Sequence, residues 1–167
     1  MLADETGLTP AHAIVTKERS NNSRGHETAA QTTELFKILI PKDNPTLREA
    51  LHVLDPEGNT LVHNIAVRGF DVLLDYVLSL ETPSRRVAMV NACAKGVDGQ
   101  ERSVLAAVRE KLRELNDRIR INRYTDDKSV RELLVEEGTR LQKCKNILCQ
   151  ARAEINPSLT KRYQISG

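Results

Sequence analysis

Asp55-Pro-Glu-Gly-Asn-Thr-Leu-Val-His63 repeats the pattern of an earlier stretch, Asp4-Glu-Thr-Gly-Leu-Thr-Pro-Ala-His12, with Asp, Gly, Thr and His displaced by 51 positions. In each copy a glycine three residues after the aspartate predicts a tight turn, because glycine reaches backbone angles that other residues avoid. Thr9 and Thr60 then stand where a helix N-cap is expected, and Pro10 is the residue favoured at the first helical position. We therefore predict that both stretches turn the chain and start a helix.

A second helix is expected after each of these starts. The first is Thr33–Ile40, which ends before Pro41 and whose Leu35, Phe36, Leu39 and Ile40 are predicted to share one apolar face. In the next unit Gly69 is expected to break the chain. Between Gly69 and Pro83, apolar residues recur at helical spacing: Val72, Leu73, Tyr76 and Val77.

A third unit with a weaker signal is predicted to begin at Asp98. Ser103 takes the cap position before the apolar run Val104–Val108, and this helix could extend to Ile121. Further along the chain we expect a helix over Ser129–Glu137 that Gly138 stops, and a last helix at Leu141–Ile155. No alternation typical of strands is found, and the core must consist of Leu, Val, Ile and Ala, because aromatic residues make up only 3% of the chain.

The charge balance argues against direct nucleic-acid binding. The 25 basic and 23 acidic residues give a net charge of +2, whereas a phosphate-binding domain usually shows a basic excess. The mixed run Lys111–Arg123 is interpreted as a solvated helix face. We find no signal peptide and no apolar stretch of the roughly 18 residues that cross a bilayer. We therefore expect no membrane contact and an intracellular protein, in cytoplasm or nucleus.

The order of turn, cap, helix, glycine and second helix resembles the ankyrin repeat. The family's Thr-Pro-Leu-His signature is similar to Thr9-Pro-Ala-His12 and Thr60-Leu-Val-His63, and its glycine between helices to Gly69. Met89-Val-Asn-Ala92 resembles the family's linker, and Val130–Gly138 its second helix with the closing glycine. This irregular layout is also similar to the ankyrin domains of fungal cell-cycle transcription regulators.

The resemblance implies an all-α fold, an ankyrin-repeat solenoid of about three irregular helix-turn-helix repeats plus a C-terminal helix. The domain would cover residues 1–155, with repeats at about 4–54, 55–97 and 98–138, the last helix at about 140–155, and a tail at 156–167. An ordinary repeat has about 33 residues, so the polar segment Thr16–Thr28 is interpreted as an insertion. The third unit also departs from the family pattern, with Glu101 in place of glycine and Ala106 in place of histidine.

Repeat proteins of this kind hold other proteins on an extended surface. The resemblance therefore implies a non-enzymatic module that binds another protein through its finger tips and the exposed positions of a first helix. These positions are Glu5, Thr6, Glu57, Asn59, Asn64, Val67 and Arg68. It also assigns His12 and His63 to structure. We expect no catalytic residue, metal or cofactor, because no phosphate loop or nucleophile motif is present, and Asp126-Asp127 fits an ordinary helix start.

Two further hypotheses remain open at this point. A self-association or assembly domain is the alternative function, in which the third unit's long first helix and the Leu141–Ile155 helix would pair between chains. The apolar stripe of that long first helix is formed by residues 104, 105, 108, 112, 115 and 119. The chain is also expected to be a fragment of a longer protein, because Asp4 already lies in a first finger.

The three cysteines, Cys93, Cys144 and Cys149, are predicted to be free thiols, buried or half-buried.

Overall fold

The computed structural model describes residues 8–16, 25–95, 101–121 and 128–153, and helices make up most of this part of the chain. The helices are α1 (Pro10–Thr16), α2 (Gly25–Leu39), α3 (Pro45–Arg48), η1 (Glu49–His52), α4 (Leu61–Val67), α5 (Asp71–Ser79), α6 (Pro83–Asn91), α7 (Val104–Ile121) and α8 (Lys128–Ala153). Two short strands, β1 (Cys93–Lys95) and β2 (Glu101–Ser103), pair antiparallel. The predicted all-α class is confirmed.

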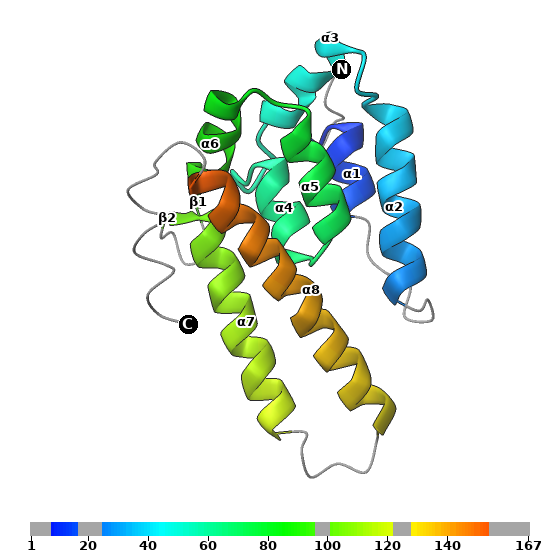
Figure 1. The fold of residues 1–167 in the computed structure, drawn as a ribbon, viewed down its shortest axis with the longest axis vertical. Coiled ribbons are helices and arrows are strands. Elements are labelled where there is room, and N and C mark those ends of the chain that lie inside the picture. Colours follow the sequence, from blue (N-terminus) through cyan, green and yellow to red (C-terminus); the bar gives the residue numbers. More distant parts are fainter. Residues whose placement is uncertain (1–7, 17–24, 96–100, 122–127, 154–167) are drawn as a thin grey trace.

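Helices that follow one another along the chain form pairs, and the two members of each pair lie in different layers (Figure 1). Each pair, α1 with α2, α4 with α5 and α7 with α8, is in contact. The first members, α1, α4 and α7, pack side by side in one layer, and α2, α5 and α8 form the other. The core between the layers is mainly aliphatic, with Phe36 and Phe70 as its aromatic members. Burial of this shared apolar surface holds the pairs together, because an isolated helix pair would leave its inner face in water.

The two repeated stretches start equivalent helices. Thr60 caps α4 with its hydroxyl, which accepts from the backbone N–H of His63 and lies 2.8 Å from His63 Nδ1. Thr9 does the same for His12 at the start of α1, again with 2.8 Å between Oγ1 and Nδ1. Because α1 and α4 also pack against each other, the repetition in sequence corresponds to a repetition in structure. The predicted N-caps are confirmed.

Gly69 ends α4 as predicted and allows another helix to approach. Its φ of +71° lies in the left-handed region, and the backbone N–H of Phe70 reaches back to the carbonyl of Ile65, the pattern of a glycine-capped helix end. A Cβ atom at Gly69 would lie 3.3 Å from the Cβ of Arg140. The turn between α4 and α5 therefore packs closely on α8.

The predicted helix stop at Gly138 is wrong. α8 continues through this position from Lys128 to Ala153, so the expected third-repeat boundary at 138 and the separate helix at 140–155 are one helix. Only Gly58 and Gly69 have a positive φ among the described glycines. A Cβ at Gly138 would lie 3.3 Å from Cδ2 of Leu115. Gly138 thus lets α7 and α8 approach each other, and the extension of α7 to Ile121 is confirmed.

The segment between α5 and α7 also differs from expectation. Met89–Ala92 was predicted to be a linker, but Met89, Val90 and Asn91 belong to α6, which Thr82 caps and Pro83 begins. The β1–β2 pair follows, with Cys93 opposite Ser103. Strands of three residues are too short to show alternation, so no pattern in the sequence indicates them. Ser103 does cap α7, since its hydroxyl accepts from the N–H of Ala106.

Two apolar faces were assigned incorrectly in part. Phe36 in α2 and Ile40 just after it are buried, but Leu35 is exposed. In α5, Val72 was included in the apolar face but is exposed, while Leu74 was left out but is buried. α2 also begins at Gly25, inside the expected Thr16–Thr28 insertion. Helical spacing alone does not fix the borders of an apolar face, so residues at its edge can be assigned to the wrong side.

Candidate binding surfaces

The turn that precedes α4 is organised around one buried carboxylate. Asp55 Oδ1 accepts from the backbone N–H of Asn59 at 2.7 Å and from that of Glu57 at 3.0 Å. Asp55 Oδ2 accepts from the side-chain amides of Asn59 and Asn64, at 3.2 and 2.8 Å. Gly58 supplies the positive φ of this turn, +78°. The tip is therefore fixed by its own side chains.

The candidate partner-binding residues differ in how available they are. Glu57 is exposed at the tip of this turn, where its Oε2 accepts from the side-chain amide of Asn59 at 3.2 Å. Asn59 and Asn64 are half-buried and their amides are used by Asp55, so their side chains hold the turn together. Glu5 and Thr6 lie outside the described residues.

Val67 and Arg68 complete the candidate set at the other end of α4. Val67 is half-buried and packs against the hydrophobic core. Arg68 donates from Nη2 to the backbone carbonyl of Thr16 at 3.2 Å, which links the ends of α4 and α1. The structure thus brings Asn59, Asn64 and Glu57 together around Asp55, while Arg68 lies at the far end of the same helix. Among the five candidates that the structure describes, Glu57 is the exposed one.

His63 joins two helical pairs. Its Nε2 lies 3.2 Å from the backbone carbonyl of Arg102 in β2, and a carbonyl only accepts, so Nε2 carries the proton and Nδ1 accepts from the Thr60 hydroxyl. Burial lowers the pKa of His63 from its ordinary value, and the Arg102 carbonyl and Asp55 partly oppose this shift. Burial likewise lowers the pKa of His12, against a smaller effect of Asp55. Both rings serve as neutral structural groups.

The other chemistry-bearing side chains do not form a reactive cluster in the described part of the chain. No group of three His, Cys, Asp or Glu residues there is arranged to hold a metal ion.

All three cysteines are free. Cys144 and Cys149 are buried and half-buried as predicted, but Cys93 is exposed, so the prediction is wrong for it. Burial raises the pKa of Cys144 to about 12. Among the described residues, no helix combines the length and the hydropathy of a membrane-spanning segment.

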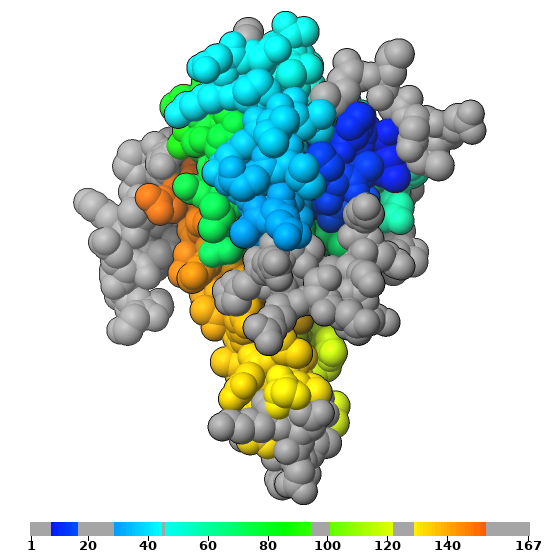
Figure 2. Space-filling view, turned by 90° about the vertical axis from the view of Figure 1, so that its right-hand side faces the viewer, coloured from blue at the N-terminus to red at the C-terminus, as the bar shows by residue number. Residues whose placement is uncertain are grey.

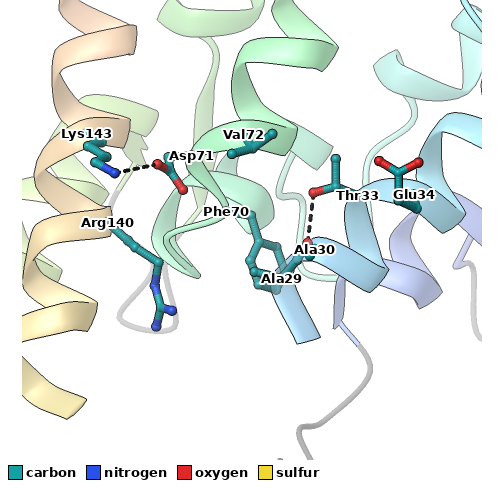
Figure 3. Close-up of a pocket in the computed structure, with 9 residues that line it drawn as sticks. All are labelled: Ala29, Ala30, Thr33, Glu34, Phe70, Asp71, Val72, Arg140 and Lys143. Atoms are coloured by element: carbon teal, nitrogen blue, oxygen red, sulfur yellow. Dashed lines mark hydrogen bonds and ion pairs between the residues drawn. The ribbon is translucent and has the colours of Figure 1, made fainter. Parts of the chain in front are cut away.

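The sequence did not predict a groove that lies among the second helices α2, α5 and α8. Its deeper part is a hollow of about 270 Å³ lined by Ala29, Ala30, Thr33, Glu34, Phe70, Asp71, Val72, Arg140 and Lys143 (Figure 3). An adjoining hollow of about 380 Å³ shares Asp71, Val72 and Lys143 with it and continues along α5 and α8. No local signal marks this groove, because its residues come from three helices that are far apart in sequence.

The far halves of α7 and α8 extend beyond the other helices (Figures 1 and 2). This projecting segment carries exposed apolar side chains at Ile121, Val130, Leu133 and Val135. By contrast, the α7 stripe that was expected to pair between chains is buried or half-buried at all six positions, with α8 as its main neighbour. The stripe is therefore covered within the chain, and pairing of these helices between chains stays a prediction.

Comparisons with protein-family models, curated proteins and solved structures give no match for this chain.

Proposed function

We propose that this chain is a divergent ankyrin-repeat module whose function is to bind another protein. The equivalent starts of α1 and α4 support this proposal, because each is closed by a threonine and a histidine at the positions of the family signature. The bond from His63 to the carbonyl of Arg102 adds to it, since it ties one helical pair to the turn before the next. The layered arrangement of α1, α4 and α7 against α2, α5 and α8 is compatible with a stack of three irregular units.

The proposed contact surface is the turn Asp55–Asn59 together with the half-buried positions of α4 and its C-cap, Asn64, Val67 and Arg68. One observation carries it: the turn is fixed by a buried carboxylate that accepts four hydrogen bonds, while Glu57 remains exposed at the tip. A tip that is already ordered loses little conformational entropy on binding, so its contacts contribute more to affinity. The exposed carboxylate of Glu57 favours a partner with a basic group at this position.

Charge reversal at Glu57 tests this surface. We expect Glu57→Arg to reduce recovery of co-purifying proteins at least about tenfold in quantitative affinity purification, because a favourable charge contact becomes a repulsive one. Asp117→Arg is the matched control, since Asp117 is an exposed acid on α7. Asn64 and Arg68 are less suitable for substitution, because their side chains also hold Asp55 and Thr16. Equal recovery with Glu57→Arg and the wild type would contradict the proposed surface.

Self-association remains a second candidate function, now through the projecting segment of α7 and α8. The observation in its favour is the exposure of Ile121 and Leu133, of which 74% and 55% are accessible, since a cluster of exposed apolar side chains often marks an interface. Light scattering at high protein concentration separates the two candidates. A chain that stays monomeric would rule self-association out, while protein binding through the Glu57 tip requires no dimer.

A further inference from the structure

The deeper hollow of the α2–α5–α8 groove contains a buried cation that is only partly used. The Arg140 side chain is 8% exposed, and its Nη1 pairs with Glu136 Oε1 at 2.8 Å. Its Nε has no hydrogen-bond acceptor among the described residues. Figure 3 shows the guanidinium group directed away from α8 toward the side of the hollow where Phe70 and Ala29 lie. A buried charged donor without an acceptor is unfavourable, so an incoming acceptor here would be stabilised.

Two more features favour an anion in this hollow. Helix α5 begins here without a side-chain cap from Phe70 and with Asp71 in its first turn, so the positive end of the helix dipole lies at this opening. Lys143 lies at the same opening, and its Nζ is 3.6 Å from Asp71 Oδ2. This is a loose ion pair between a largely exposed lysine and a carboxylate, and such a pair adjusts at little cost.

The charges around the hollow favour an anion with a single charge. Each carboxylate there is paired with a cation: Glu34 with Lys37, Asp71 with Lys143 and Glu136 with Arg140. The surroundings are therefore close to neutral, and one carboxylate is accommodated at a lower electrostatic cost than a phosphate with a charge close to two. The apolar lining comes from Ala29 and Ala30 of α2 and from Val72 of α5, and Val72 is 63% exposed.

We propose that this hollow binds one carboxylate side chain of a partner polypeptide, with a neighbouring apolar side chain of the same partner against Val72. The carboxylate would accept from Arg140 Nε and approach the first N–H groups of α5. A volume of about 270 Å³ accommodates a side chain of this size, and the adjoining hollow provides a path for the rest of the partner segment along α5 and α8. This site lies among the second helices, so it is separate from the Glu57 tip.

Two capped dipeptides test the proposal. They differ only in whether the second side chain ends in a carboxylate or in an amide. Acetyl-Leu-Glu-amide and acetyl-Leu-Gln-amide would be titrated into the ¹⁵N-labelled full chain, and the Arg140 Nε–Hε signal and the Asp71–Leu73 amides would be followed by NMR. We expect saturable shifts at these groups with the glutamate peptide, and affinity at least about tenfold lower for the glutamine peptide, which lacks the charge-assisted bond. Inorganic phosphate is expected to shift these signals only at higher concentration than the glutamate peptide.

Arg140→Lys is the diagnostic variant, because lysine keeps the charge but has no Nε–H in the same place. We expect it to weaken binding of the glutamate peptide at least about tenfold, while Arg152→Lys, an exposed arginine on the same helix, leaves binding unchanged. If Arg140→Lys does not fold, the wild-type shift at Arg140 Nε decides the question. Equal binding of both dipeptides, tighter binding of phosphate, or no shift at Arg140 Nε would overturn the proposal. None of these outcomes bears on the Glu57 tip.

Discussion

Replacing His63 by alanine is expected to lower the free energy of unfolding by about 3 kcal/mol. The substitution removes the bond to Thr60 and the bond to the Arg102 carbonyl, each contributing about 1 kcal/mol. It also leaves a space in a buried position, which adds a further cost of roughly 1 kcal/mol. Urea denaturation followed by far-ultraviolet circular dichroism measures this loss.

His12 provides the matched comparison for His63. It makes the equivalent bond to Thr9, but its Nε2 is buried without a partner among the described residues. His12→Ala should therefore cost about 1 kcal/mol less than His63→Ala, because one hydrogen bond fewer is lost. If both variants unfolded at the same urea concentration, or if His63→Ala cost less than His12→Ala, the bridging role of His63 would be incorrect.

Replacing Gly69 by alanine is expected to cost about 2 to 3 kcal/mol. An L-residue at a φ of +71° is strained by about 1–2 kcal/mol. The new Cβ would also meet the Arg140 Cβ at 3.3 Å, and this atom is fixed to the backbone of α8, so relief requires a movement of the helix. The loss is measured by the same denaturation experiment.

Gly58→Ala separates the two causes of this loss, which are the backbone strain and the contact of the new Cβ with Arg140. The φ of Gly58 is +78°, but no heavy atom lies within 4 Å of a Cβ built there. Gly58→Ala should therefore show the backbone strain alone, about 1 kcal/mol. Similar losses for Gly58→Ala and Gly69→Ala would mean that the turn after α4 does not pack closely on α8, contrary to the arrangement described above.

Local signals in the sequence predicted the helix starts well. A threonine or serine cap acts within its own first turn, so Thr9, Thr60 and Ser103 could be identified without knowledge of the rest of the fold. Thr82-Pro83 has the same combination of cap and proline as Thr9-Pro10, and this signal could have predicted α6. It was interpreted as an ending instead, because proline was considered only as the residue that stops α5.

Features that depend on distant contacts could not be predicted in this way. Gly69 and Gly138 are the same residue in the sequence, yet Gly69 ends a helix while Gly138 lies inside one against Leu115. Only the position of the neighbouring helix distinguishes them. The burial of Arg140 has the same origin, since it follows from α8 meeting the turn at Gly69 and Phe70, and no pattern around residue 140 indicates it.

The turn at the candidate site could be predicted from the sequence, while its role in partner binding stays a prediction. The turn and its glycine follow from the spacing of Asp55 and Gly58, and the structure places Glu57 at its exposed tip. The roles of Asn59 and Asn64 were not predictable, because a polar residue at a turn is equally suited to bind a partner or to hold its own turn. Their bonds to Asp55 give them the second role in this chain.

In this fold the Thr60–His63 pair starts one helical pair and fixes it to the next through the Arg102 carbonyl. Imidazole ¹⁵N spectra of His63, recorded as a function of pH together with nuclear Overhauser effects, report on both contacts. We expect a neutral ring protonated at Nε2, a pKa below its ordinary value of about 6.5, and contacts from the ring to β2. A ring that exchanges between tautomers, titrates near 6.5 and shows no contact with Arg102 or Ser103 would contradict it.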